Sequence, residues 1–162
     1  MALSVRRRWG LAAVVGIVVV AALVVWWLWP TREAPRARQY RDVDVCLLTD
    51  GKGLSGPVAA PAWAGLGDVS GTEHVRISAL AADDAVAGSA LVSANTLANR
   101  HCGVIVAAGQ GPVAAARDIA PRYTGIQFVL VGSGTTGANV TWVDAGSDVR
   151  AGIRNAVLPL VS

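Results

Sequence analysis

Three glycine-rich segments of this 162-residue chain contain residue types that could hold a ligand, and each follows a run of apolar residues. They are Asp50 to Gly56 (DGKGLSG), Gly109 to Gly111 (GQG) and Gly132 to Gly137 (GSGTTG). Glycine allows tight turns and lets the backbone come close to a bound molecule. Because the apolar runs have the length of buried strands, the pattern predicts that these segments are loops at strand ends.

Polar groups in these loops form the candidate ligand site. Asp50 follows the first apolar run directly, where its carboxylate either contacts a ligand or accepts hydrogen bonds from the next backbone amides in a turn. Both interpretations of Asp50 stay open. The predicted ligand-binding residues are Asp50, Gly51, Lys52, Gly109, Gln110 and Ser133.

The first loop also matches the phosphate-binding pattern G-x-G-x-x-G, from Gly51 to Gly56. In dinucleotide-binding proteins an acidic residue at the end of the second strand holds the ribose. Here Glu73 precedes the second expected strand instead. A flexible turn is therefore favoured for this loop, and no cofactor is expected.

Catalytic chemistry has little support in the sequence. The chain has two cysteines, Cys46 and Cys102, and two histidines, His74 and His101, at spacings that do not match a zinc site. No G-x-S-x-G nucleophile motif is present. We expect no catalytic residue and no metal site, and we predict that the protein is not an enzyme.

The two cysteines lie in or beside neighbouring expected strands. Outside the cytoplasm, Cys46 and Cys102 would be oxidised to a disulfide. The alternative is a pair of buried free thiols, because neighbouring strands often place their Cα atoms in a geometry that does not suit a disulfide.

Short β-branched runs alternate with longer segments rich in small residues, which predicts an α/β fold. The expected strands are Val43 to Thr49, His74 to Leu80, Gly103 to Ala108, Ile126 to Val131 and Val140 to Val143. We expect a doubly wound parallel sheet of about five strands with flavodoxin-like order, in which the first strand lies between the second and the third. Ligands of such sheets bind at the carboxyl ends of the strands, where the winding reverses.

Helices are expected between these strands. The first, from Ala59 to Asp68, is weakened by Gly65 and Gly67. The longest runs from Asp83 to Asn99, with Asp83 as its N-cap. A third has Pro112 in its first turn and ends at Arg122, and a last one is capped by Ser147 or Asp148 and disturbed near Pro159.

Residues 10 to 29 carry no charge and, at about 1.5 Å per residue, are long enough to cross a bilayer as a helix. Arginines precede this segment and tryptophans end it, which favours a cytoplasmic N-terminus. We expect a basic cytoplasmic end at 1–9, one transmembrane signal anchor at 10–29, a linker at 30–41 and an extracytoplasmic domain at 42–162. A cleaved secretory signal is the alternative, and it also exports the domain.

Charge is divided unevenly along the chain. Residues 1–41 carry a net charge of +6, whereas residues 42–162 carry −3. A nucleic-acid-binding domain would concentrate lysine and arginine on its folded part. No nucleic-acid partner is therefore expected, and the cell membrane is the expected partner of the N-terminal segment.

Several segments of the domain, taken in order, resemble the basic membrane protein (BMP) family of nucleoside-type substrate-binding lipoproteins of bacterial ABC importers. They are Leu48 to Gly51 with Gly53, Ala62 to Leu66, Gly103 to Gly109, Ala120 to Tyr123, Gln127 to Leu130 and Asn139 to Thr141. The resemblance implies a type I periplasmic-binding-protein fold, of which residues 42–162 form the first lobe only. The family's first loop carries an aromatic residue that stacks on the nucleobase, whereas Ser55 to Ala60 contain neither an aromatic residue nor an amide side chain.

From these features we expect a membrane-anchored, extracytoplasmic, solute-binding-like module whose ligand binding is degenerate. The resemblance implies an ABC transporter permease or a second lobe, as in a homodimer, as partner. The alternative is an exported docking or structural domain that no longer binds a solute.

Overall fold

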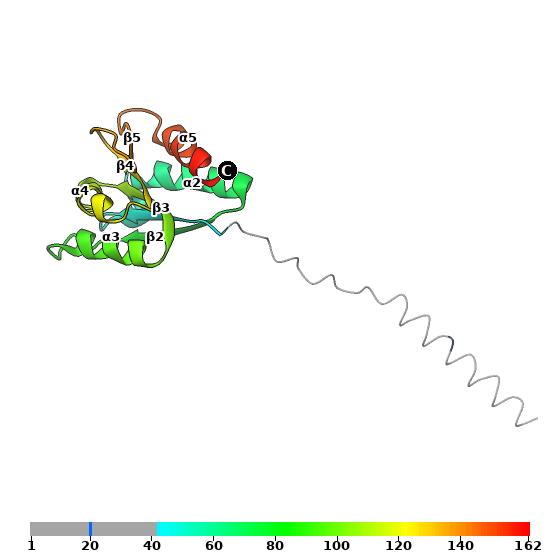
Figure 1. Ribbon diagram of the computed structural model, residues 1–162, viewed down its shortest axis with the longest axis horizontal. Helices are drawn as coiled ribbons and strands as arrows, with labels where there is room; N and C mark the ends of the chain where they lie inside the picture. Colours follow the sequence, from blue (N-terminus) through cyan, green and yellow to red (C-terminus); the bar gives the residue numbers. More distant parts are fainter. Residues whose placement is uncertain (1–19, 21–41) are drawn as a thin grey trace, which may run out of the picture. The chain divides into compact units, whose positions relative to one another are not determined.

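The computed structural model describes Val20 and residues 42–162. A five-stranded parallel sheet forms the centre of the domain, in the order β2-β1-β3-β4-β5 (Figure 1). Its strands are β1 (Asp44–Thr49), β2 (Arg76–Ala81), β3 (Cys102–Ala108), β4 (Gln127–Val131) and β5 (Val140–Val143). This confirms the predicted flavodoxin-like order, with β1 between β2 and β3.

Helices cover both faces of the sheet, with α2 and α5 on one side and α3 and α4 on the other (Figure 1). The helices are α2 (Ala59–Glu73), α3 (Ser89–Asn99), α4 (Gln110–Ile119) and α5 (Val149–Val161), and the 3-10 turns are η1 (Gly53–Ser55) and η2 (Ala120–Arg122). Strand residues alternate between the two faces. Val45 and Leu47 therefore pack under α2 and α5, and Leu48 packs under α3 and α4.

An extra residue in β3 changes the phase of this alternation. Asp44 pairs with Cys102 but Val45 pairs with Val104, so Gly103 is left over as a bulge. Glycine suits this place, because a Cβ on Gly103 would lie 3.1 Å from the Val43 side chain. Because of the bulge, Cys102 lies on the same face of the sheet as Ile105, whereas uninterrupted alternation would place it on the face of Val104.

Helix α2 is longer than predicted, since it continues past Asp68 to Glu73 despite three internal glycines. Gly65 explains part of this result. A Cβ on Gly65 would lie 2.5 Å from the carbonyl oxygen of Arg150, so α2 and α5 can pack this closely only with glycine at that point. The tertiary contact thus compensates for the low helix propensity.

The prediction that Asp83 caps a helix starting there is wrong, because α3 begins at Ser89 after Gly88. The Asp83 carboxylate accepts a hydrogen bond from the Ala85 amide at 2.9 Å, and the Asp83 amide donates to Ser89 Oγ at 2.8 Å. These local bonds hold a turn, which competes with the helix for the same backbone groups.

Helix α5 begins as predicted, with the Asp148 carboxylate accepting a hydrogen bond from the Ala151 amide at 3.1 Å. It also continues through Pro159 to Val161, so the expected disturbance does not end the helix. Only Leu160 and Val161 follow this proline in the helix, so little helix remains to be bent beyond it.

The three expected N-terminal segments, 1–9, 10–29 and 30–41, lie outside the described residues except for Val20. Among the residues that are described, no helix combines the length and apolar character needed to span a membrane.

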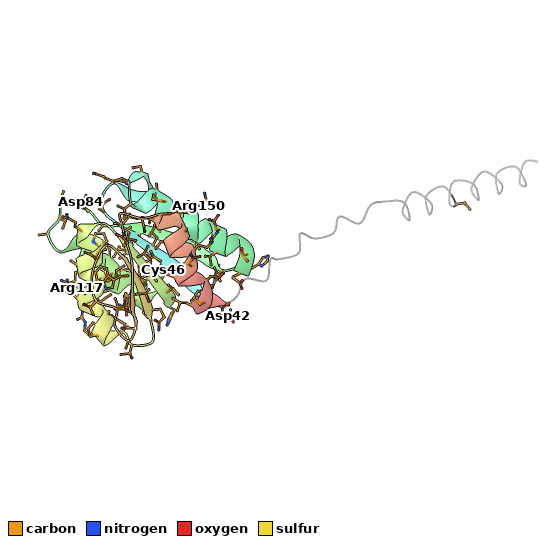
Figure 2. The ribbon with its side chains drawn as sticks, turned by 90° about the horizontal axis from the view of Figure 1, so that it is seen from above. Asp42, Cys46, Asp84, Arg117 and Arg150 are labelled. Atoms are coloured by element: carbon orange, nitrogen blue, oxygen red, sulfur yellow. A yellow bond between two sulfur atoms is a disulfide. The ribbon has the colours of Figure 1, made fainter. Side chains whose placement is uncertain are left out.

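One surface ion pair joins the two helices on the same face of the sheet. Arg150 of α5 donates to both carboxylate oxygens of Asp68 of α2, at 2.7 and 2.8 Å (Figure 2). The hydrogen bond and charge of Arg150 lower the pKa of Asp68 below its ordinary value. The same hydrogen bond raises the pKa of Arg150.

We expect the stabilising effect of this pair to depend on pH. Because the folded-state pKa of Asp68 is lowered, the stabilisation is present above the unfolded carboxyl pKa of about 3.9 and is lost as the pH falls through the folded value. The difference in unfolding free energy between wild type and Asp68→Asn should therefore be larger at neutral pH than in strong acid. Urea denaturation at pH values across this range measures the difference in unfolding free energy. Arg150→Gln should behave in the same way, and a pH-independent difference in both variants would contradict the assignment.

Candidate functional site

The first two predicted loops meet at the carboxyl ends of β1 and β3. Gly109 has φ of 112°, and a Cβ on it would lie 3.2 Å from Asp50 Oδ2. Glycine is thus required at Gly109 by both its conformation and the nearby carboxylate. Asp50 Oδ1 accepts a hydrogen bond from the Lys52 amide at 3.1 Å, which is the turn geometry that the sequence left as one alternative.

Gly51 lies beside the loop between β2 and α3, and not beside α4. A Cβ on Gly51 would lie 2.8 Å from Asp84 Oδ2, in the loop that follows β2. Lys52 is exposed. Neither residue lines the cavities described next, so the structure separates these two predicted residues from Gly109, Gln110 and Ser133.

A cavity of about 480 Å³ lies between α4 and the ends of β4 and β5. Gly109, Gln110 and Ser133 all line it, so the structure brings together three of the six predicted residues. One wall is a single face of α4, formed by residues at helical spacing. This face consists of Gln110, Val113, Ala114 and Arg117.

A second cavity, of about 680 Å³, adjoins the first. It extends under the loop that follows β4 and reaches Pro121 and Thr124. The residues that line both cavities are Arg117, Ser133 and Trp142. We call the two cavities together the α4 groove.

Trp142 of β5 forms the aromatic wall of the α4 groove. Its indole N–H donates a hydrogen bond to the Thr135 carbonyl oxygen at 3.0 Å. A Cβ on Gly134 would overlap the indole ring, so this loop can lie against the ring only with glycine at that position. The loop from Gly132 to Thr135 and the ring therefore hold each other in place.

Arg117 is the only charged residue among those that line the α4 groove in the described part of the chain. It lies on the outer face of α4 (Figure 2), and its side chain is 64% exposed. Its Nε is 4.0 Å from an Asp118 carboxylate oxygen, a distance typical of a weak surface ion pair. The groove consequently has a positive charge at its centre and no acidic residue in its walls.

The residues with reactive side chains lie elsewhere. His74 follows α2 and lies two residues before β2, and His101 directly precedes β3, so both lie at the amino ends of strands, away from the groove. Cys46 and Cys102 are joined by a disulfide with a Cα–Cα distance of 5.9 Å, in the interior of the domain (Figure 2). Among the described residues, no group of three or more histidine, cysteine or acidic side chains could hold a metal ion.

Among the groove residues that sequence reasoning missed, Arg117 carries the charge and Trp142 the aromatic ring. Each had a signal that could have been used. Arg117 lies seven residues after Gln110, on the same helix face. Trp142 is a large aromatic residue in a four-residue strand, which by itself predicts core packing as readily as a ligand contact.

Comparisons with known proteins support a statement about the fold only. No family model matches the chain, and no curated protein does. Among solved structures, the chain is similar to a fragment from Peptoclostridium difficile 630 provisionally described as a lipoprotein. The TM-score is 0.64 at 17% identity, over 74% of this chain and 99% of the fragment. This match shows a shared α/β fold.

Two longer proteins match at a TM-score of 0.49 and 18% identity. One is a transcriptional activator of the comK gene from Bacillus halodurans, matched over 60% of this chain and 33% of that protein. The other is a solute-binding protein of an ABC transporter system from Aeropyrum pernix K1, matched over 62% of this chain and 28% of that protein.

Proposed function

We propose that this chain is a non-catalytic, solute-binding-like module of the cell envelope, held at the membrane by its N-terminal segment. The α4 groove carries the proposal. It begins at Gly109, at the carboxyl end of β3, and runs between α4 and the β4–β5 side of the sheet, beside the point between β1 and β3 where ligands of parallel α/β sheets bind. It gathers Gly109, Gln110 and Ser133 from two of the three predicted loops. The volumes of its two cavities, about 480 and 680 Å³, lie in the range of small-molecule sites.

The chemistry of the groove supports binding over catalysis. Within the described residues, its walls offer two amides, one guanidinium, hydroxyl groups and an aromatic ring, but no histidine or acidic side chain to act as a general base. The two cysteine sulfurs are bonded to each other and therefore are not nucleophiles. Such a set of groups can orient a solute without changing it.

Display outside the membrane is supported by the disulfide and by the N-terminal sequence. Disulfides persist in oxidising compartments and are rare in the cytosol. The arginines before residues 10–29 favour a cytoplasmic N-terminus, which would leave residues 42–162 on the other side. The resemblance of the sequence to BMP lipoproteins supports the same location and a link to an ABC importer.

A single lobe leaves one side of its solute in water. Residues 42–162 form one sheet with its helices, whereas a type I binding protein closes two such lobes around the ligand. We therefore expect weak solute binding by the isolated chain, and a second lobe or a permease as the partner that covers the solute.

The sheet edge at β2 favours a second candidate function, that of an exported docking domain that pairs with another copy of itself. β2 is an edge strand, and all of its residues are exposed or half-buried. An edge strand presents unpaired backbone groups to which another strand can add. In this candidate the groove binds no solute.

A thermal-shift screen of the full-length protein in detergent tests the proposal. Nucleosides and other small polar solutes at millimolar concentration should raise the melting temperature for at least one class, because a ligand that binds only the folded state stabilises it. Gln110→Ala should weaken the shift, and Lys52→Ala, outside the groove, should leave it unchanged. Absence of any shift would contradict solute binding, and a dimer by size exclusion with light scattering would then favour docking.

A further inference from the structure

We infer that the α4 groove selects small planar acids, with a flat ring against Trp142 and an acidic group at Arg117. The inference rests on the proposed function and specifies its solute class. The two residues come from elements that are distant in sequence, α4 and β5, and both line both cavities. The junction of the cavities is therefore the only place in the groove that offers an aromatic surface and a charge together.

Trp142 is half-buried: it packs against the core under α3 and α4, and the part of its side chain that stays uncovered lines both cavities. The indole N–H donates to the Thr135 carbonyl oxygen at 3.0 Å, and the packing of Gly134 fixes the ring orientation. A ring that is held in place loses little conformational freedom when a ligand stacks on it. Flat, conjugated solutes gain more from such a surface than saturated ones do.

Arg117 sets the sign of the charge that the groove accepts. No carboxylate lines either cavity in the described residues, so a cationic solute would meet only the like charge of Arg117. A guanidinium binds a carboxylate or phosphate through two parallel hydrogen bonds. The Ser133 hydroxyl lines the same junction and supplies a further donor.

Size limits the solute further. The two cavities, of about 480 and 680 Å³, each suit a solute of one or two rings. Because both open to solvent beside the exposed Arg117 side chain, the acidic group can stay partly hydrated while the ring is covered. This arrangement predicts that the ring and the acidic group of the solute each contribute to affinity, and that each contribution can be removed separately.

Isothermal titration of the full-length protein in detergent with three matched probes tests both contributions. Indole-3-acetate is planar and acidic, indole-3-acetamide is planar and neutral, and cyclohexylacetate is acidic without a planar ring. We expect the first to bind about tenfold more tightly than either of the others. Arg117→Gln should abolish the preference for acid over amide, and Trp142→Leu should abolish the preference for the planar ring.

Two further variants control this experiment. Trp142→Phe keeps a flat ring and should retain most of the planar preference, which separates a stacking role from a folding role. Arg154→Gln removes an exposed arginine from α5, on the other face of the sheet, and should change nothing. Melting temperatures verify that each variant is folded.

The possible failures are distinguishable. If other solutes bind but the three probes do not, or if Arg117→Gln and Trp142→Leu leave every affinity unchanged, the planar-acid inference is wrong and solute binding stands. Equal binding of indole-3-acetate and its amide likewise overturns the role of Arg117. If no solute of any class binds, the proposed function fails together with the inference.

Discussion

The double variant Cys46→Ala/Cys102→Ala should unfold with a free energy about 4 kcal/mol lower than that of the wild type. The disulfide spans 56 residues, and closing a loop of that length restricts the unfolded chain by about this amount. It also joins the two central strands of the sheet, β1 and β3, on the face under α3 and α4. For a domain of this size, the loss corresponds to a fall in melting temperature of roughly 15 °C.

Reduction of the disulfide in the wild-type protein under denaturing conditions should give the same loss of unfolding free energy. Ser78→Ala is the matched control, because Ser78 Oγ lies 3.4 Å from Cys46 Sγ and the variant leaves the disulfide intact. Urea denaturation of all forms measures the effect. Equal stability of the double variant and the oxidised wild type would contradict the prediction, and mass spectrometry after alkylation shows whether the wild type was oxidised.

Gly65→Ala should lower the free energy of unfolding by about 2–3 kcal/mol. The added Cβ would lie 2.5 Å from the Arg150 carbonyl oxygen and 3.2 Å from the Ile153 Cβ. Neither neighbour can move away freely, since one is backbone of α5 and the other belongs to a fully buried side chain. Helices α2 and α5 would have to separate, and overpacking of this kind costs about 1–3 kcal/mol or more.

The same helix supplies the control for Gly65. A Cβ on Gly67 or on Gly71 would have no heavy atom within 4 Å. Gly67→Ala and Gly71→Ala should therefore raise the free energy of unfolding by about 0.5–1 kcal/mol each, through helix propensity alone. If all three variants change stability in the same direction, the close approach of α2 and α5 is not what constrains Gly65.

The sequence predicted the strands and their order because burial on both faces leaves a local signal. A continuous apolar run such as Gly103 to Ala108 is typical of a central strand of a parallel sheet. Right-handed crossovers then leave few arrangements open. The helix boundaries were less accurate, because Gly65 depends on neighbours distant in the chain and the turn at Asp83 depends on local side-chain hydrogen bonds that helical periodicity does not indicate.

The candidate site, like the fold, was predicted from the sequence only in part. Asp50 and Gly109 were predicted from loop composition, and the structure places them in contact. Arg117 and Trp142 were missed, because a helix face and an edge strand have no local feature that indicates a shared cavity. Lys52 shows the converse, since it belongs to a predicted loop but does not line the groove.

The sequence by itself thus determined the α/β class, the strand order and the location of the glycine loops, since each follows from periodicity, glycine content and chain connectivity. The tertiary structure decided which loop residues share a cavity, that the two cysteines are bonded, and that Trp142 and Arg117 line the same cavities. These outcomes depend on the packing of α4 against the sheet and on the bulge at Gly103. The distances between segments that are remote in sequence are fixed only when the whole core is packed.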